Sequence, residues 1–293
     1  MGKVATLLLA AAASAAAVAS AAGDSFWPAA APTNEVRVAV RVLRNNMPIV
    51  EGTLDGRPCT LLFDTGATHT TFDLGFVKRE FPDAKLEHVL LAGATNVEKQ
   101  PQLFNAGSLK IGEAEFAGFS AMALDISHLA GGVGVRIDGI AGMNVIGRVR
   151  TLVSLGGKEI FFAPSARRLD GFTVAAKRRS EDPFTIAFRA RYNDRPVDII
   201  VDSAASFTFL DEALGWPTEG DAAGLSAVNV NGGASIAPKR GAPGQISAGI
   251  PLAVSPLVVA GSMNCIGSDV LQRYDMVVEP GRVAFRRHAG ESE

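Results

Sequence analysis

The sequence predicts an all-β protein made of two similar lobes. Apolar residues fall in short runs rich in Val, Ile and Phe, a composition typical of short strands. The chain also contains 31 Gly and 15 Pro, which separate these runs as turn residues do. Finally, the pattern of residues 49–73 returns at residues 187–211. A repeated strand-rich segment indicates one design used twice.

The first strands of the fold can be placed by their periodicity. Val alternates with Arg or Ala over residues 36–42, which is the period of a half-buried strand. Residues 49–54 and 58–63 then flank Asp55 and Gly56, a dipeptide that closes tight hairpins. The second arm of this hairpin ends at Asp64, followed by Thr65, Gly66 and Ala67.

The repeat needs no gap, because Asp202 lies 138 residues after Asp64 and Asp211 lies 138 residues after Asp73. The overlay places turn residues over turn residues and one Asp over the other. Its identical pairs are Arg57 with Arg195, Pro58 with Pro196, Asp64 with Asp202, Ala67 with Ala205, Thr70 with Thr208, and Asp73 with Asp211. Each half is therefore expected to have a hairpin whose second arm ends at an Asp.

A second similarity lies further along each half. Residues 140–142 and 265–267 both consist of two apolar residues followed by Gly. Each segment is followed by an apolar strand, a Gly turn and a last strand. We expect Asp73, Asp138, Asp211 and Asp269 to be helix caps or loop residues, and His69 to be a loop residue.

These observations divide the chain. The expected parts are a signal peptide at 1–21, a linker at 22–35, an N-terminal lobe at 36–163, a linker at 164–183, a C-terminal lobe at 184–288 and a tail at 289–293. The second linker is rich in Lys, Arg and Ser, so its basic run at 177–179 reads as exposed linker charge.

The first residues have the features of an export signal. Lys3 precedes an apolar, Ala-rich run over residues 4–18, and small residues at 19–21 fit a cleavage site. We expect a periplasmic or secreted protein with no membrane contact after cleavage. An uncleaved anchor is the alternative, although the run is shorter than the ~20 residues of a typical spanning helix.

Composition excludes several classes of protein. The net charge of −2 and the pI near 6.1 leave no basic surplus for nucleic acid. The four His and two Cys show no metal-ligand spacing, so we expect neither metal nor cofactor. Cys59 and Cys265 lie in apolar runs of opposite lobes and are expected to be free, buried thiols.

An apolar strand ending in Asp-Thr/Ser-Gly, with a later apolar-apolar-Gly segment, resembles the aspartic peptidase pattern. Ala67 after the first triplet resembles the retroviral form. The resemblance implies two acid-protease-like barrel lobes of six or more strands with a cleft between them. It implies catalytic roles for Asp64 and Asp202 across that cleft. It also implies that two segments pin the catalytic loops, through Ile140, Gly142, Ile266 and Gly267.

The chemistry of such a pair follows from electrostatics. Two adjacent carboxylates cannot both ionise cheaply, so they share one proton and titrate together. The ionised member can deprotonate a water that attacks a peptide carbonyl, while the protonated member polarises the carbonyl oxygen. Hydrolysis then needs no Ser, Cys or metal nucleophile.

Small residues support the two loops. Gly66 permits a sharp turn, and the hydroxyls of Thr65 and Ser203 can hydrogen-bond across the lobe interface. Ala67 and Ala205 lack a hydroxyl that would stabilise an ionised Asp, so we expect a less acidic pH optimum than that of gastric-type enzymes.

Two segments are candidate flaps over a substrate. By position these are residues 90–100, with Gly93, and residues 228–234, with Gly232. Neither assignment follows from a motif.

The departure from the family pattern is Ala204, where the family has Gly. A Cβ there would crowd the turn and could displace Asp202. Two functions therefore stay open: a monomeric aspartic endopeptidase acting on polypeptides, or a catalytically impaired protein that binds extended peptides. A third possibility is that only the first lobe is active and pairs between chains.

Overall fold

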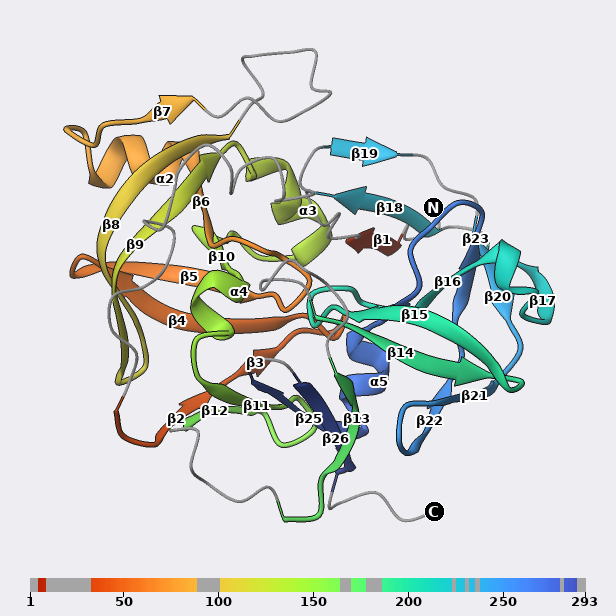
Figure 1. Cartoon of the computed structure of the whole chain (residues 1–293). Coiled ribbons are helices and arrows are strands. Elements are labelled where there is room, and N and C mark those ends of the chain that lie inside the picture. The colour runs from red at the N-terminus through yellow and green to blue at the C-terminus, as the bar shows by residue number, and fades with distance from the viewer. Residues whose placement is uncertain are drawn as a thin grey trace.

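The computed structural model describes residues 5–8, 33–88, 101–163, 170–177, 186–222, 225–229, 232–234, 238–279 and 282–288. Strands dominate, and they gather into three large sheets and one small one. Figure 1 shows one lobe on the left, a second lobe on the right and a sheet that runs beneath both.

The first lobe is an eight-stranded sheet that closes on itself. Its order is β3-β4-β5-β10-β6-β9-β8-β7, and β4 also pairs with β8, which closes a six-stranded barrel. The strands are β3 (Arg41–Val42), β4 (Pro48–Leu54), β5 (Arg57–Phe63), β6 (Thr71–Asp73), β7 (Glu87–His88), β8 (Gln102–Ile111), β9 (Ala114–Leu124) and β10 (Gly139–Ala141).

The second lobe is a curled nine-stranded sheet. Its order is β17-β20-β23-β16-β24-β15-β14-β21-β22, and no pairing among the described residues closes it. The expectation of two barrels thus holds for the first lobe only. The strands are β14 (Ala187–Tyr192), β15 (Arg195–Val201), β16 (Phe209–Asp211), β17 (Thr218–Asp221), β20 (Lys239–Gly241), β21 (Gly244–Ser247), β22 (Pro251–Val254), β23 (Leu257–Val259) and β24 (Cys265–Ile266).

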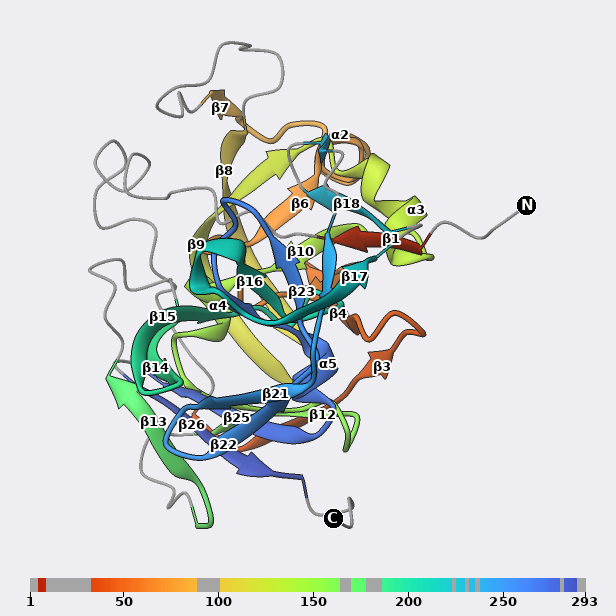
Figure 2. The same ribbon diagram turned by 90° about the vertical axis from the view of Figure 1, so that its right-hand side faces the viewer.

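A six-stranded sheet joins the lobes. Its order is β13-β26-β25-β11-β12-β2, and its central pair, β11 with β25, brings the two halves of the chain together. The strands are β2 (Val36–Ala39), β11 (Arg150–Ser154), β12 (Glu159–Ala163), β13 (Thr173–Lys177), β25 (Tyr274–Glu279) and β26 (Arg282–Arg287). Figure 2 shows this sheet from the side, beneath the lobes.

Two segments depart from the sequence expectation. The alternating run at 36–42 is divided between β2 and β3, which belong to different sheets. Residues 173–177, expected inside a linker, form β13, an edge strand paired with β26. Their Val and Ala content is compatible with a paired strand, whereas the neighbouring basic residues indicated a segment exposed to solvent.

The repeated hairpins form as expected. Asp55 and Gly56 have φ of 46° and 79°, and Asn193 and Asp194 have φ of 46° and 60°. Positive φ at both central residues is the geometry that matches the twist of two-residue hairpins. The second strand of each hairpin, β5 or β15, leads to one of the two repeated Asp residues, Asp64 or Asp202.

Short helices follow the loops that begin at Asp64 and Asp202. Asp73 accepts a hydrogen bond from the Phe76 amide and caps α2 (Leu74–Glu80). Asp211 caps η4 (Glu212–Leu214) through the Ala213 amide, so both expected caps are confirmed. The remaining helical turns are η3 (Ser127–Leu129), α3 (Ala130–Val133), α4 (Met143–Ile146) and α5 (Ser268–Leu271).

A small sheet has the order β1-β18-β19, from β1 (Ala5–Leu8), β18 (Leu225–Asn229) and β19 (Gly232–Ala234). β1 lies parallel to β18 and beside α3 of the first lobe (Figure 2). It falls within the segment expected to be removed as a signal peptide, and that removal stays a prediction. Within the described parts of the chain, no helix has the length and apolarity needed to cross a bilayer.

The core runs through both lobes and the joining sheet. Its largest side chains are Phe residues that are almost fully buried, including Phe63, Phe162, Phe188 and Phe285. Phe63 lies next to Asp64, so the strand that ends at the Asp64 loop is anchored in this core. Cys59 and Cys265 are free and buried, as predicted.

Candidate active site

The two repeated Asp residues meet at the lobe interface. Asp64 directly follows β5 and Asp202 directly follows β15, and their exposed fractions are 1% and 2%. The backbone amide of Asp64 donates to the Ala141 carbonyl at 3.0 Å, and that of Asp202 donates to the Ile266 carbonyl at 3.0 Å. Each Asp is therefore held by the apolar-Gly segment of its own lobe.

The two loops bind their carboxyl groups in the same way. In each loop, two backbone amides donate to the Oδ1 atom of the Asp. The donors to Asp64 are Gly66 at 2.7 Å and Ala67 at 3.0 Å, and those to Asp202 are Ala204 at 2.8 Å and Ala205 at 2.9 Å. Ala204 thus makes the bond that its counterpart Gly66 makes.

Four hydrogen bonds connect the loops to each other across the interface. The Thr65 amide donates to Ser203 Oγ at 3.1 Å, and the Ser203 amide donates to Thr65 Oγ1 at 3.0 Å. Each hydroxyl then donates to a strand of the opposite lobe, at the carbonyls of Val201 (3.1 Å) and Phe63 (2.7 Å). This reciprocal arrangement fixes the relative position of the two Asp residues.

The electrostatics of the pair favour a retained proton. Burial raises the pKa of Asp64 to about 6, against the effect of the Gly66 amide and of hydrogen bonding with Asp202. Burial and the negative charge of Asp64 raise the pKa of Asp202 well above its ordinary value. Both carboxyl groups therefore resist ionisation.

The pinning segments need their glycines. A Cβ at Gly142 would lie 2.5 Å from the carbonyl carbon of His69, and a Cβ at Gly267 would lie 2.3 Å from the Phe207 carbonyl oxygen. Real Cβ atoms do not approach so closely, so any side chain would push away the loop that follows Asp64 or Asp202. Ile140 and Ile266 are almost fully buried beside them.

The structure does not bring every candidate to this site. Gly93 and the rest of the first candidate flap lie outside the described residues. Gly232 begins β19, in the hairpin of the small sheet. His69 is buried, and its Nδ1 atom lies 3.0 Å from Thr68 Oγ1.

Sequence reasoning missed a second layer behind the loops. The Thr70 and Thr208 hydroxyls donate to Asn144 and Asp269, respectively. Asp269, expected to be a simple cap or loop residue, is therefore attached to the Asp202 loop. The signal was present, because Thr70 and Thr208 coincide in the repeat and Asn144 and Asp269 each follow a pinning Gly by two positions.

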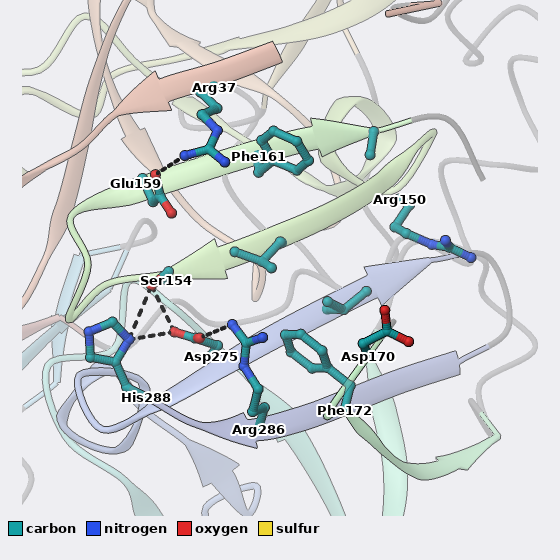
Figure 3. A pocket seen from close by; sticks show the side chains of 13 residues that line it. Arg37, Arg150, Ser154, Glu159, Phe161, Asp170, Phe172, Asp275, Arg286 and His288 are labelled. Carbon is teal, nitrogen blue, oxygen red and sulfur yellow. Dashed lines mark hydrogen bonds and ion pairs between the residues drawn. The ribbon is translucent and has the colours of Figure 1, made fainter. Parts of the chain in front are cut away.

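A separate groove of about 320 Å³ opens on the outer face of the six-stranded sheet. Neither Asp64 nor Asp202 lines it. Figure 3 shows Ser154, Asp275 and His288 at one end, where Ser154 Oγ donates to Asp275 at 2.7 Å and His288 Nδ1 lies 2.9 Å from the same carboxyl oxygen. Because the carboxylate binds both other groups, this trio does not form the Ser–His–Asp chain of a hydrolase.

No cluster of three His, Cys, Asp or Glu side chains suited to a metal ion occurs among the residues that the structure describes. The carboxyl groups of Asp64 and Asp202 act on each other electrostatically, and a Cβ at Gly66 would collide with Asp202.

Comparison with known proteins agrees with this geometry. The family model for aspartyl protease matches residues 50–145, a range that includes the Asp64 loop and the segment that pins it. A search of curated proteins finds no match. Residues 50–145 of this chain thus form a domain of the retropepsin-like aspartyl protease family.

Proposed function

We propose that the chain is an aspartic endopeptidase that hydrolyses polypeptides with Asp64 and Asp202. One observation carries the proposal: two loops of the same construction hold their carboxyl groups against each other in one chain. The family match covers the first of these loops. The second is supported by the repeat and by its matching hydrogen bonds.

One carboxyl of the pair must be ionised while the other holds the shared proton. We assign the proton to Asp202, whose pKa is raised by burial and by the negative charge of Asp64. Asp64 takes a proton from a water molecule as the water oxygen bonds to the peptide carbonyl carbon. Asp202 gives its proton to the carbonyl oxygen, and a neutral diol results.

The second step reverses the roles. Asp64 donates its new proton to the amide nitrogen, Asp202 recovers a proton from one diol hydroxyl, and the C–N bond breaks. The products are a carboxylic acid and an amine, and the dyad returns to its starting protonation. No covalent intermediate with the enzyme is required.

Access requires a conformational change. The two carboxyl groups are 1% and 2% exposed, so a peptide cannot reach them in the observed arrangement. We infer that substrate enters when the elements over the dyad move apart, as lids do in other hydrolases. The β18–β19 hairpin is the described element that we propose as one such lid.

The proposal extends to the molecule as a whole. Since one chain carries both Asp residues, the active form is proposed to be a monomer with a substrate cleft between its lobes. The apolar N-terminal run supports export to the periplasm or the outside of the cell.

The test is cleavage of a denatured protein by the wild type, Asp64→Asn and Asp202→Asn, each with and without a statine-type inhibitor. Loss of inhibitor-sensitive cleavage in both variants supports the proposal. Loss in Asp64→Asn alone would indicate pairing of first lobes between chains. Peptide binding without cleavage by any protein would favour the binding module instead.

A further inference from the structure

A threonine behind each catalytic loop connects the loop to its pinning segment. Thr70 and Thr208 each lie six residues after a catalytic Asp, and both are fully buried. Thr70 Oγ1 accepts the Gly142 amide at 3.1 Å, and Thr208 Oγ1 accepts the Gly267 amide at 3.1 Å. The hydroxyl proton of each Thr is then free for a second partner.

The second partner differs between the lobes. Thr70 Oγ1 donates to the Asn144 side chain at 2.8 Å, whereas Thr208 Oγ1 donates to the Asp269 carboxyl at 2.9 Å. Asn144 is fully buried and its amide group also donates to the Ser120 carbonyl. The chain of hydrogen bonds from the pinning Gly through the Thr, called the relay below, therefore ends at a neutral amide in the first lobe. In the second lobe it ends at an acid.

Three hydrogen bonds and the peptide link between Ile266 and Gly267 connect Asp269 with the backbone of Asp202. Its Thr208 partner binds Gly267, whose neighbour Ile266 accepts the Asp202 amide at 3.0 Å. The carboxyl groups of Asp202, Asp269 and Asp64 all act electrostatically on one buried thiol, Cys265, whose pKa they raise together with burial. The three acids therefore all lie near enough to the Cys265 thiol to act on it electrostatically.

The surroundings of Asp269 set its ionisation. Burial raises its pKa to about 6, opposed by the Thr208 hydroxyl, the Val270 amide and the positive charge of Arg273. Arg273 donates to the Ala253 carbonyl, so it is a fixed neighbour. Asp269 thus changes charge in the same pH range as Asp64, whose pKa burial also raises to about 6.

We propose that Asp269 is a positioning residue through which the second catalytic loop, unlike the first, responds to pH. Asp269 thereby extends to higher pH the range in which the dyad keeps its shared proton. The inference rests on the proposed function of the dyad. A negative charge on Asp269 disfavours a second negative charge nearby, so Asp64 and Asp202 keep their shared proton to higher pH. Its bond to Thr208 keeps this charge at a constant distance from the loop.

Asp269→Asn tests the proposal with a replacement that the first lobe already uses at the equivalent place. Its side-chain oxygen can accept from Thr208 as Asn144 accepts from Thr70. We expect the alkaline limb of the hydrolysis profile to move to lower pH by roughly 0.5 to 1 unit. The matched control is Asp194→Asn, which removes the same charge from a fully exposed hairpin turn of the same lobe and should leave the profile unchanged.

Thr208→Val separates position from charge. It removes the hydroxyl link while keeping the acid, so we expect a lower kcat with the alkaline limb displaced less than in Asp269→Asn. A limb that stays in place in Asp269→Asn overturns the proposal. Failure of Asp269→Asn to fold also overturns it, because the proposal requires the amide to be accommodated as in the first lobe.

A titration without substrate distinguishes this proposal from the proposed function. Carboxyl ¹³C NMR can follow Asp64 and Asp202 in the wild type and in Asp269→Asn, whether or not either protein cleaves peptides. Lower midpoints for the dyad in the variant support the inference. Unchanged midpoints contradict it, while absence of cleavage with shifted midpoints contradicts only the peptidase assignment.

Discussion

Gly66 of the first lobe lies directly against the carboxyl group of Asp202 in the second. A Cβ built at Gly66 would stand 2.5 Å from Asp202 Cγ and 2.6 Å from its Oδ2. The absence of a side chain at one residue thus allows the acid of the other lobe to approach. The meeting of the two carboxyl groups depends on this contact as well as on the hydrogen bonds around them.

The first prediction is that Gly66→Ala abolishes hydrolysis. The new methyl group must displace Asp202, and a displacement of about 1 Å at a reacting group can reduce the rate roughly 100-fold. The measurement is kcat/KM on a denatured protein, together with binding of a statine-type inhibitor. Gly131→Ala is the control, because a Cβ there meets nothing within 4 Å, and it should retain full activity.

The second prediction concerns Ala204, whose Cβ departs from the family pattern. The Ala204 and Ala205 amides already bind Asp202 as closely as Gly66 and Ala67 bind Asp64. We therefore expect Ala204→Gly to change kcat/KM by less than about threefold, a rate effect well under 1 kcal/mol. A large gain in activity would mean that Ala204 does distort the site.

The same substitution should reduce stability. Ala204 is fully buried and packs in an apolar cluster with Ile140 and Leu62 of the first lobe. Loss of its methyl group, and the greater freedom of Gly in the unfolded chain, should together cost about 1–2 kcal/mol. Urea unfolding of the wild type and Ala204→Gly measures this difference.

The third prediction concerns the reciprocal bonds between Thr65 and Ser203. Ser203→Ala would leave the Thr65 amide and the Phe63 carbonyl buried without their present partner, at a cost of about 1–3 kcal/mol for each group. Thr65→Val should cost a similar amount. Because the two hydroxyls belong to one network, the double variant should lose clearly less than the sum of the single losses. Additive losses would show that the loops are held independently.

How much of this could be foreseen from the sequence is clearest at the two loops. Asp64 and Asp202 are recognisable because the repeat places them at the ends of matching hairpins, and local turn chemistry fixes such hairpins. The closed first barrel and the open second sheet were not foreseeable in this way. They depend on whether distant strands pair, as β4 pairs with β8, and periodicity does not encode pairing partners.

The assembly of the joining sheet was not predicted, for a related reason. Strand β13 lies in a segment with neighbouring basic residues, whose composition did not indicate a strand. It forms a strand by pairing with β26. Asp269 was interpreted as a cap because Asp is common in such positions. Its attachment to Thr208 is a tertiary contact across 61 positions, which spacing alone does not reveal.

The fourth prediction concerns the pH dependence of stability. The pKa of Asp64 is raised to about 6 in the folded protein and that of Asp202 is raised well above its ordinary value, so both groups bind protons more tightly when folded than when unfolded. The resulting stabilisation is complete below the ordinary pKa of an Asp and is lost as pH rises through the folded values. We expect Tm to fall between about pH 4 and pH 7.

Asp202→Asn provides the check on this pH dependence. The amide cannot ionise, so the variant should lose much of the decline in Tm and exceed the wild type in stability at neutral pH. The comparison is thermal unfolding of both proteins across that pH range. A variant with the same slope as the wild type would place the titrating groups elsewhere.

The last prediction concerns the seam where β11 meets β25. Arg150 and Glu279 lie opposite each other across this seam, 2.6 Å apart, and each side chain is 7% exposed. Glu279 also pairs with Arg282, so its carboxylate serves two arginines. Glu279→Gln removes the counter-charge from both arginines, so it should destabilise the protein more than Arg150→Met, by about 3 kcal/mol or more.

Urea unfolding of both single variants and of the double variant Arg150→Met with Glu279→Leu measures the coupling. Removing both charges should cost less than Glu279→Gln alone, since no buried ion is then left unmatched. Glu159→Gln is the control, because Glu159 pairs with Arg37 at 3.6 Å on the same sheet with both side chains well exposed, and it should cost at most about 0.5 kcal/mol. An equal loss in the free energy of unfolding for all three single variants would contradict this prediction, because the buried pair would then matter no more than the exposed one.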